Sequence, residues 1–299
     1  MCATCGCDDT EGVRIEGFDD HADGDEHDHD HEHTHDDHHH NGHYHGDGHH
    51  VHAAGQGHAH GHASDGAVET ITLDQDVLAK NDRLAAQNRQ WLADHGIRAV
   101  NLMSSPGAGK TTLLERTVRE LAVAEPVAVI EGDQETPMDA LRLRATGCRT
   151  VQVNTGAGCH LDADMLAKAL RSLDPEDGSV VFIENVGNLV CPALFDLGEG
   201  RRVVLASTTE GEDKPLKYPH MFRAADLVLL TKADLLPYVP FEQGRFTEHL
   251  RRVNPDAELL PVSAVSGAGL GEWHDWLRAA VSAATTRRRQ GGHGDRRTP

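Results

Sequence analysis

From residue 97 onward, short apolar runs alternate with polar stretches that have helical spacing. Such runs, bounded by charged residues, glycine or proline, are typical of buried strands. They comprise residues 97–103, 127–130, 151–154, 180–183, 203–206 and 227–230, and a last strand leads into residues 262–264. Helical spacing is found at residues 161–173 and 270–284. This alternation predicts an α/β fold, with a mostly parallel sheet flanked by helices.

A longer amphipathic helix is predicted before the first of these strands, at residues 76–95. Its apolar side chains on or near one face are Val77, Leu84, Trp91 and Leu92. Gly96 follows the last helical residue and is a candidate C-cap. We expect the helix to pack as an arm on the domain that follows.

The loop Ser104–Thr112 has the pattern of a phosphate-binding loop between a strand and a helix. Gly107 and Gly109 let the backbone direct its N–H groups at the α- and β-phosphates. Lys110 is predicted to reach the β- and γ-phosphates, and Thr111 to offer a hydroxyl to Mg²⁺. Ser104 stands where this motif usually begins with glycine. The other residues predicted to contact the nucleotide here are Ser105, Ala108 and Thr112.

Two acidic residues follow buried strands, where they face the ligand crevice of a parallel sheet. Glu184 ends the run at 180–183, and Gly187 follows three residues later. This spacing predicts an Mg²⁺ ligand and a backbone N–H for the γ-phosphate. Asp133 is a second candidate Mg²⁺ ligand, with an ordinary loop or N-cap aspartate as the alternative. Together with Lys110 they form the predicted catalytic set. Turnover should be slow, since the sequence suggests no arginine finger or water-positioning glutamine.

The tetrapeptide Thr231–Asp234 predicts guanine as the base. A carboxylate at Asp234 accepts the two N–H groups of the guanine edge, whereas adenine would leave the charge unpaired, a mismatch worth on the order of 10⁴ in selectivity. Lys232 is expected to lie along the base. Ser263 and Ala264 would present main-chain N–H groups to the guanine oxygen. Asn is the commoner first residue of this motif, and Thr231 could loosen the loop without changing the base.

Negative charge is concentrated near the N-terminus. The formal net charge is −20, and residues 8–65 hold sixteen acidic residues against the single Arg14. Outside the basic tail at 286–299 there is no lysine- or arginine-rich cluster, which argues against nucleic acid or anionic lipid as a partner. No apolar leader or membrane-spanning run is found, so we expect a cytoplasmic location.

Seventeen of the 23 histidines lie between His21 and His62, interleaved with acidic residues and glycine. Because almost no large apolar side chain lies among them, we expect this region to be disordered. Neutral imidazoles and carboxylates offer overlapping sites for Ni²⁺, Zn²⁺ or Cu²⁺, which predicts a metal reservoir. A cloning tag and a pH-sensitive solubilising tail are the alternatives.

The cysteines are better explained as metal ligands, reactive thiols or core residues than as disulfides in a cytosolic protein. Cys2, Cys5 and Cys7 are close enough to wrap one thiophilic ion, with a redox pair as the alternative. Cys159 and His160 lie in a loop directly before the predicted helix at 161–173, and they suit half a metal site, a nucleophile with its base, or a structural loop. Cys191 lies on the segment that should move when the γ-phosphate is lost.

The motifs at residues 1–7, 104–112, 154–161, 184–192 and 231–234, with the histidine-rich insert, together resemble HypB, the hydrogenase-maturation nickel-incorporation GTPase. The resemblance covers the chain from about residue 67 and the N-terminal cysteines. It implies a dimerising P-loop GTPase, related to signal-recognition and nitrogenase-iron proteins. Nickel would pass, with a small zinc-binding partner, to the precursor of the [NiFe]-hydrogenase large subunit.

The resemblance also implies roles for the cysteines. It makes Cys159, His160 and Cys191 ligands of a Ni²⁺/Zn²⁺ site at a GTP-dependent homodimer interface. The implied role of Cys2, Cys5 and Cys7 is a tight nickel site. Two other functions stay open: a nickel or zinc store with incidental GTPase activity, and a related accessory GTPase for urease or cobalamin enzymes.

Four regions are predicted in all. They are a cysteine motif at 1–7, a disordered His/Asp-rich region at 8–66, a GTPase domain with its helical arm at 67–285, and a basic tail at 286–299.

Overall fold

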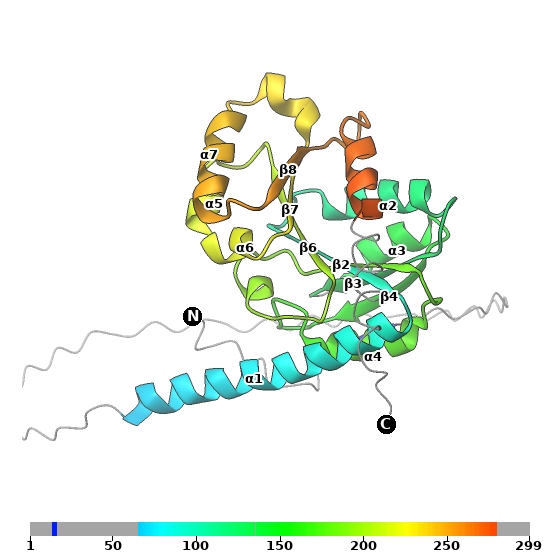
Figure 1. Cartoon of the computed structure of the whole chain (residues 1–299), viewed down its shortest axis with the longest axis vertical. Coiled ribbons are helices and arrows are strands. Elements are labelled where there is room, and N and C mark those ends of the chain that lie inside the picture. Colours follow the sequence, from blue (N-terminus) through cyan, green and yellow to red (C-terminus); the bar gives the residue numbers. More distant parts are fainter. Residues whose placement is uncertain (1–13, 17–64, 135, 280–299) are drawn as a thin grey trace, which may run out of the picture. The chain divides into compact units, whose positions relative to one another are not determined.

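The computed structural model describes residues 14–16, 65–134 and 136–279 (Figure 1). For Glu16 and residues 65–75, the description covers the backbone alone. The chain divides into two units, one of residues 1–18 and 74–299 and one of residues 19–73. The cysteine motif at 1–7, nearly all of the His/Asp-rich region and the basic tail lie outside the described residues. The architecture below is that of the first unit.

An eight-stranded sheet forms the centre of this unit, in the order β1-β4-β3-β5-β2-β6-β7-β8. All neighbouring strands are parallel except β1 and β4. The strands are β1 Arg14–Glu16, β2 Arg98–Ser104, β3 Val127–Asp133, β4 Arg149–Asn154, β5 Val180–Glu184, β6 Arg201–Ser207, β7 Leu227–Thr231 and β8 Glu258–Pro261. The predicted α/β fold with a mostly parallel sheet is therefore confirmed.

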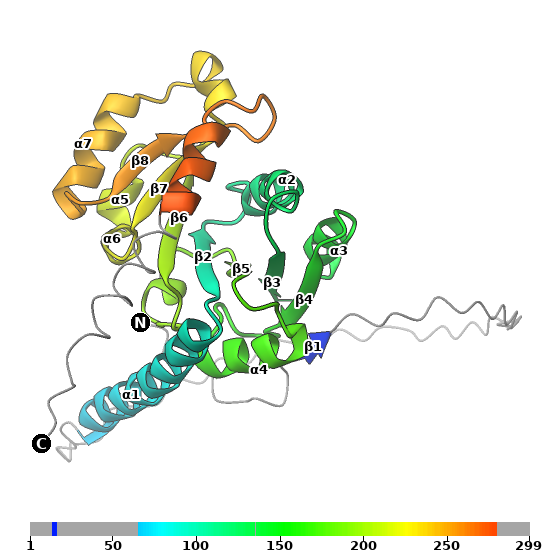
Figure 2. The same cartoon turned by 45° about the vertical axis from the view of Figure 1, so that its right-hand side comes forward.

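Helices cover both faces of the sheet (Figure 2). α2, α3 and the helix of residues 270–279 pack on one face, and α1 and α4 pack on the other, while α6 and α7 cover β6 and β7. The helices are α1 Asp65–Asp94, α2 Lys110–Leu121, α3 Met138–Arg144, α4 Ala163–Leu173, α5 Lys214–Lys217, α6 Pro219–Arg223 and α7 Gln243–Val253, with 3-10 turns η2 Cys191–Ala193 and η3 Ala233–Tyr238. Among the described helices, none is long and apolar enough to cross a bilayer.

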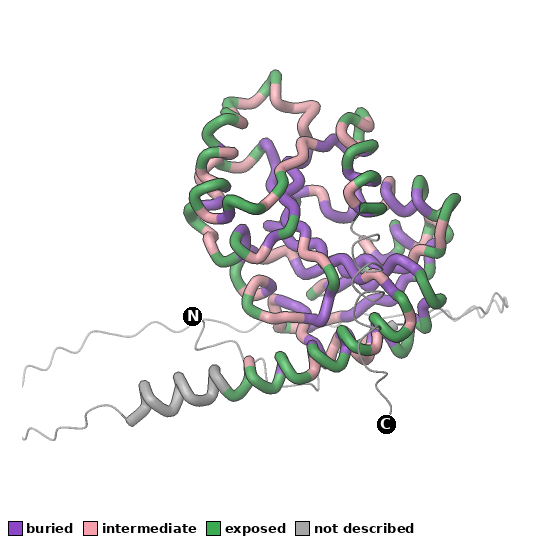
Figure 3. Tube along the Cα trace, viewed as in Figure 1, coloured by how far each residue is buried: buried purple, intermediate pink, exposed green. Residues whose placement is uncertain are grey.

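The central strands are buried on both faces, which explains their continuous apolar sequence (Figure 3). Side chains alternate between the two faces along each strand. Val129 and Phe182 belong to the core under α2 and α3, whereas Ile130 and Ile183 belong to the core under α1 and α4. This alternation determines which face receives each polar residue at the strand ends.

One strand lies inside the region predicted to be disordered. Arg14–Glu16 pairs antiparallel with β4, with Arg14 opposite Asn154. Ile15 packs partly buried against the core beneath α4. The prediction of disorder over 8–66 is thus wrong for these three residues, because one β-branched side chain is enough to anchor a short edge strand.

The predicted arm is the C-terminal part of α1. Leu92 is buried, and Leu84 and Trp91 are partly buried, as expected. Val77 lies on the same face, four residues before Asn81, but it is 42% exposed and so adds little to the buried contact. Gly96 follows the helix end with a φ of 65°, as a glycine C-cap does.

Two asparagines take the place of apolar residues in this contact. Asn88 donates to the carbonyl oxygens of Ala163, at 2.7 Å, and Leu197, at 2.9 Å. Asn81 accepts from the Ala163 N–H at 2.9 Å. Both asparagines are buried, and they are seven residues apart on one face of α1. The arm is therefore held by side-chain hydrogen bonds to loop backbone as well as by apolar burial.

Replacing Asn88 with alanine should destabilise the domain by about 1–3 kcal/mol, because the buried Leu197 carbonyl would lose the donor that Asn88 supplies and the Ala163 carbonyl would lose one of its bonds. Urea unfolding of the variant and parent measures the difference. Gln87→Ala, at an exposed position on the same turn, is the control and should change stability by less than about 0.5 kcal/mol. Equal effects of the two substitutions would contradict this account of the arm.

Candidate functional site

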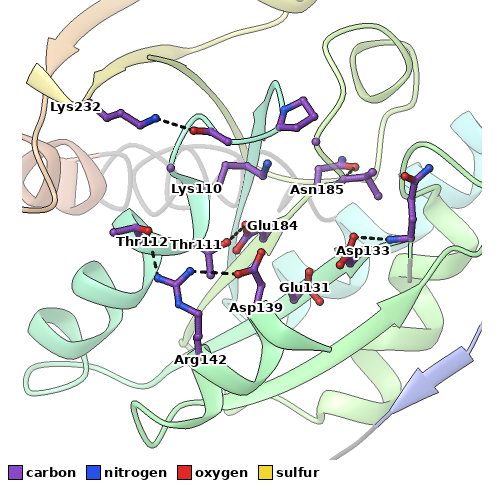
Figure 4. Close-up of a pocket in the computed structure, with 17 residues that line it drawn as sticks. Lys110, Thr111, Thr112, Glu131, Asp133, Asp139, Arg142, Glu184, Asn185 and Lys232 are labelled. Atoms are coloured by element: carbon purple, nitrogen blue, oxygen red, sulfur yellow. Dashed lines mark hydrogen bonds and ion pairs between the residues drawn. The ribbon is translucent and has the colours of Figure 1, made fainter. Parts of the chain in front are cut away.

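The carboxyl ends of the parallel strands surround a cleft of about 520 Å³ (Figure 4). Loops after β2, β3 and β5 meet the first turns of α2 and α3 there. It is lined by Pro106, Gly107, Gly109, Lys110, Thr111, Thr112, Glu131, Gly132, Asp133, Gln134, Asp139, Arg142, Glu184, Asn185, Val186, Gly187 and Lys232.

The phosphate-binding loop leads directly into α2, whose first residue is Lys110. Gly107 and Gly109 have φ values of 72° and 95°, a region that favours glycine. Nζ of Lys110 donates to Oγ of Ser104 at 2.9 Å, so the serine that replaces the usual glycine holds the lysine side chain. Burial lowers the pKa of Lys110, and the charge of Glu184 opposes that shift. The Ser105 hydroxyl donates to Glu210.

Glu184 lies at the end of β5 and faces the start of α2. The Thr111 hydroxyl donates to its Oε1 at 2.7 Å. Burial raises the pKa of Glu184 to about 7, although the charge of Lys110 and the hydrogen bond from Thr111 act in the opposite direction. Its other oxygen, Oε2, is buried and has no hydrogen-bond partner among the residues that the structure describes.

Gly187 brings the loop after β5 against the phosphate-binding loop. A Cβ atom on Gly187 would lie 3.0 Å from Cα of Pro106, closer than side chains normally approach backbone. Only glycine therefore fits here without moving one of the two loops. This contact places the Gly187 backbone next to the loop that should hold the phosphates.

Glu131 is a cleft residue that the sequence analysis missed. It is opposite Glu184 in the register of β3 and β5, and it is only 2% exposed. Burial, followed by the charge of Glu184, raises the pKa of Glu131 to about 9. Its Oε2 is also buried, and no donor in the described part of the chain bonds to it. The signal was its spacing of two residues from Asp133, which puts both side chains on the same face of β3.

Asp133 is partly exposed at the end of β3. Its Oδ1 accepts from the Gln134 N–H at 2.7 Å, and its Oδ2 accepts from the Thr136 hydroxyl at 2.7 Å. Asp133 also lines the cleft. In this structure it has the contacts of a loop aspartate, in the position expected of a switch carboxylate.

The cleft also contains a charged pair from α3, a helix that was not predicted. Arg142 lies 3.3 Å from Oδ1 of Asp139 and 2.9 Å from Oε2 of Glu115, and it donates to the Thr112 hydroxyl at 3.2 Å. Figure 4 shows Asp139 between Arg142 and Glu184. The available signal was the pair Ala140 and Leu143, whose spacing of three indicates a short helix.

The predicted guanine motif is tied to the phosphate-binding loop. The Thr231 hydroxyl donates to the Ala108 carbonyl at 2.7 Å, and Nζ of Lys232 donates to the Gly107 carbonyl at 2.9 Å (Figure 4). Threonine at 231 therefore fastens the two loops together, whereas the sequence suggested that it could loosen them.

Asp234 and the last predicted contacts lie beside each other. The Ser263 hydroxyl donates to Oδ1 of Asp234 at 2.5 Å, and the Ala233 N–H donates to the Val262 carbonyl at 3.1 Å. The Ala264 carbonyl accepts from Arg116 at 3.0 Å. Asp234, Ser263 and Ala264 are not among the residues that line the 520 Å³ cleft, which extends on this side to Lys232.

Cys159, His160 and Cys191 come together, although Cys191 lies about thirty residues after the adjacent pair Cys159 and His160. Their candidate ligand atoms all lie within 4.8 Å of one another. His160 is buried and stacks on Phe195, with ring centroids 3.9 Å apart. Burial lowers its pKa, which keeps the imidazole neutral and able to bind a metal. Cys148 is apart in the core, where burial raises the pKa of its thiol to about 11.

This cysteine–histidine cluster shares a wall with the cleft. The N–H of Leu161, which follows His160, donates to Oδ1 of the cleft residue Asn185 at 3.2 Å. A Cβ atom on Gly132 would lie 2.8 Å from the Leu161 side chain, so β3 packs closely against the same residue. A shift of the loop after β5 would therefore displace the hydrogen-bond partner of Leu161, the residue next to His160.

Comparison with known proteins agrees with this geometry. The family described as CobW/HypB/UreG, nucleotide-binding domain, matches residues 98–261. A hydrogenase maturation factor HypB of Azotobacter vinelandii is 58% identical over 207 residues, covering 69% of this chain and 68% of that protein. The chain belongs to the HypB family. The HypB of Escherichia coli K12 is 57% identical over 202 residues, covering 68% of this chain and 70% of that protein.

A solved structure of HypB has the same fold. The crystal structure of HypB from Helicobacter pylori in complex with nickel has a TM-score of 0.64 and 38% identity, and covers 68% of this chain and 96% of that one. The resemblance stated from the motifs is thus confirmed, as is the P-loop GTPase fold of the HypB family.

The two buried glutamates predict an unusual pH dependence. Their native pKa values, about 9 for Glu131 and about 7 for Glu184, exceed the ordinary 4.5, so between about pH 5 and 9 the native chain binds more protons than the unfolded chain. Stability without divalent cations should therefore fall as pH rises through this window. Between about pH 7 and 9 the loss should come mainly from Glu131, and Glu131→Gln should remove it. Urea unfolding in EDTA at about pH 7 and about pH 9 tests this prediction. An equal loss of stability between these pH values in the parent and in Glu131→Gln would refute it.

Proposed function

We propose that this HypB-family chain is a cytoplasmic, GTP-hydrolysing nickel metallochaperone that delivers Ni²⁺ to the [NiFe]-hydrogenase large-subunit precursor. The observation that carries the proposal is the wall shared by the phosphate cleft and the Cys159/His160/Cys191 cluster. The names of the A. vinelandii and E. coli relatives, and nickel in the H. pylori structure, support hydrogenase maturation and the choice of metal.

GTP is proposed to occupy the cleft with its phosphates at the start of α2. Lys110 binds the β- and γ-phosphates, and backbone N–H groups of the loop bind the α- and β-phosphates with the help of the helix dipole. Gly187 offers its N–H to the γ-phosphate. Asp234 selects guanine, and its bond to Ser263 is replaced by bonds to the base.

Hard oxygen donors beside the phosphates fit Mg²⁺. The Thr111 hydroxyl and the partnerless Oε2 of Glu184 are the nearest candidates, and Asp133 is the proposed switch carboxylate. When bound, Mg²⁺ neutralises phosphate charge and orients the transferred group. The residues themselves position GTP and exclude water, with Arg142 held by carboxylates at the cleft edge.

Ni²⁺ is the proposed cargo of the cysteine–histidine cluster. Two thiolates and a neutral imidazole suit Ni²⁺ and also Zn²⁺. Three ligands leave a coordination position open, and we propose that the site lies at a GTP-dependent homodimer interface. Loss of the γ-phosphate would release the loop after β5, which carries both Asn185 and Cys191, and lower the affinity for nickel.

The N-terminal regions are proposed to supply further nickel. Cys2, Cys5 and Cys7 would form a tight site, and the His/Asp-rich region a reservoir. The proposed partners are a small zinc-binding protein and the hydrogenase precursor. A relative from Helicobacter hepaticus, 40% identical over 215 residues, is named hydrogenase/urease maturation factor HypB, so urease is a second candidate recipient.

Lys110→Ala should lower GTP hydrolysis by about 10²- to 10³-fold, because it removes a preorganised cation from the phosphates. Phosphate release under single-turnover conditions measures the effect. Lys168→Ala on α4, whose lysine pairs with Asp164 away from the cleft, should hydrolyse GTP at the parental rate. Parental activity in Lys110→Ala would rule out this site.

Nickel affinity should depend on the bound nucleotide. A variant lacking residues 1–66 removes the N-terminal metal sites, so a titration with GDP or a non-hydrolysable GTP analogue reports on the cluster alone. We expect at least about tenfold tighter binding with the analogue, equivalent to about 1.4 kcal/mol of coupling. Cys191→Ser should lose this binding in both states. Coincident curves would favour metal storage with incidental GTPase activity.

A further inference from the structure

Two buried carboxylic side chains face the cleft side by side, and neither forms an ion pair among the described residues. Glu131 and Glu184 are register partners on neighbouring strands, at 2% and 3% exposure. Each has one buried oxygen that no donor in the described residues reaches. We propose that Glu131 supplies a second carboxylate, beside that of Glu184, to the Mg²⁺ ion that accompanies the nucleotide. The inference rests on the proposed function, and it adds a residue to the metal site.

A structural role for Glu131 is disfavoured by comparison with Glu199. Glu199 is also buried, but its oxygens accept from Arg202 at 2.6 Å, from the Leu197 N–H at 2.9 Å and from Asn101 at 3.2 Å. This fold therefore satisfies a structural buried glutamate completely. A carboxylate left without partners is costly unless a ligand completes its environment.

The cations of the cleft are committed elsewhere. Lys110 donates to Ser104, and Glu184 is the carboxylate whose charge affects the pKa of Lys110 most. Arg142 pairs with Glu115 and Asp139. In the part of the chain that the structure describes, no ion pair is formed by Glu131. The phosphates of GTP would add further negative charge beside it. A divalent cation is the partner that neutralises both.

The geometry places Glu131 where such an ion would lie. Glu131 and Glu184 project from β3 and β5 on the same face, toward the first turn of α2 (Figure 4). The Thr111 hydroxyl, the proposed Mg²⁺ ligand, bonds directly to Glu184. Mg²⁺ prefers six oxygen ligands, and these three side chains offer oxygens on one side of the cleft, with Asp133 at the end of the same strand as Glu131.

The test measures how strongly Mg²⁺ increases nucleotide affinity. Full-length parent and Glu131→Gln are titrated with a non-hydrolysable GTP analogue, in saturating Mg²⁺ and in EDTA. In the variant, the Mg²⁺-dependent increase should shrink by about 10- to 100-fold, as when a metal site loses a supporting carboxylate. Affinity in EDTA should stay unchanged at pH 7, because the Glu131 side chain is protonated there and glutamine replaces one neutral group by another. Glu120→Gln, the same substitution near the other end of α2, should alter neither value.

The thermal unfolding midpoint in EDTA separates a ligand role from a structural one. Glu131→Gln should unfold at about the same temperature as the parent at pH 7, where the parent side chain is protonated, and at a higher temperature at pH 9, where the variant lacks the buried negative charge. An undiminished Mg²⁺ effect in the variant, or an equal loss of affinity with and without Mg²⁺, would overturn the inference.

A crystal of the parent with the analogue and Mn²⁺ gives an answer that is independent of the variant. Anomalous scattering should locate the ion in direct contact with the Glu131 carboxylate or one water away, and a greater separation would overturn the inference. Failure of the parent to bind the analogue in either solution would instead reject the proposed GTP site. If the parent binds the analogue equally well with and without Mg²⁺, the proposed Mg²⁺ site, including Glu131, would be rejected, whereas the proposed GTP site would stand.

Discussion

Negative charge held out of water at the carboxyl edge of the sheet is the constraint around which this site is built. Burial raises the pKa of both Glu131 and Glu184, because it disfavours their ionised forms, and the charge of Lys110 acts in the opposite direction. Lys110 is the first residue of α2, so its ammonium group and the helix N-terminus approach the same carboxylates. Without ligands, the cleft is thus a place where the fold stores unfavourable electrostatics, as functional sites commonly do.

The second organising feature is mechanical. Asn185 lies between the phosphate cleft and the cysteine–histidine cluster, with Val186 and Leu161 both donating to its side-chain oxygen. Its amide also donates to Asn101 at 3.3 Å. A buried polar network of this kind specifies one arrangement of the loop and resists small displacements. Two discrete loop positions are therefore a better description of any nucleotide response than a gradual drift.

Much of the fold and of the phosphate site could be predicted, because those features are local in sequence. Apolar runs identified the central parallel strands, and the glycine spacing identified the turn before α2. Glu131 was missed since its importance depends on register with Glu184, a relation between strands that are about fifty residues apart. Arg142 was missed with the seven-residue helix that carries it. Val77 lies on the same helical face as Asn81 and Asn88 and is nevertheless 42% exposed, because helical periodicity gives the face of a residue but not how far along the helix another element covers it.

The contact between Cys159 and Cys191 also depends on residues that are far apart in the sequence. Residue chemistry suggested a metal site, but only the tertiary structure brings the ligand atoms within reach of each other.

The close approach of Gly187 to Pro106 adds a consequence for engineering. Any side chain at 187 would need the backbone at Pro106 to move by a few tenths of an ångström. The tolerance of position 187 in a sequence library therefore depends on how far the phosphate-binding loop can shift.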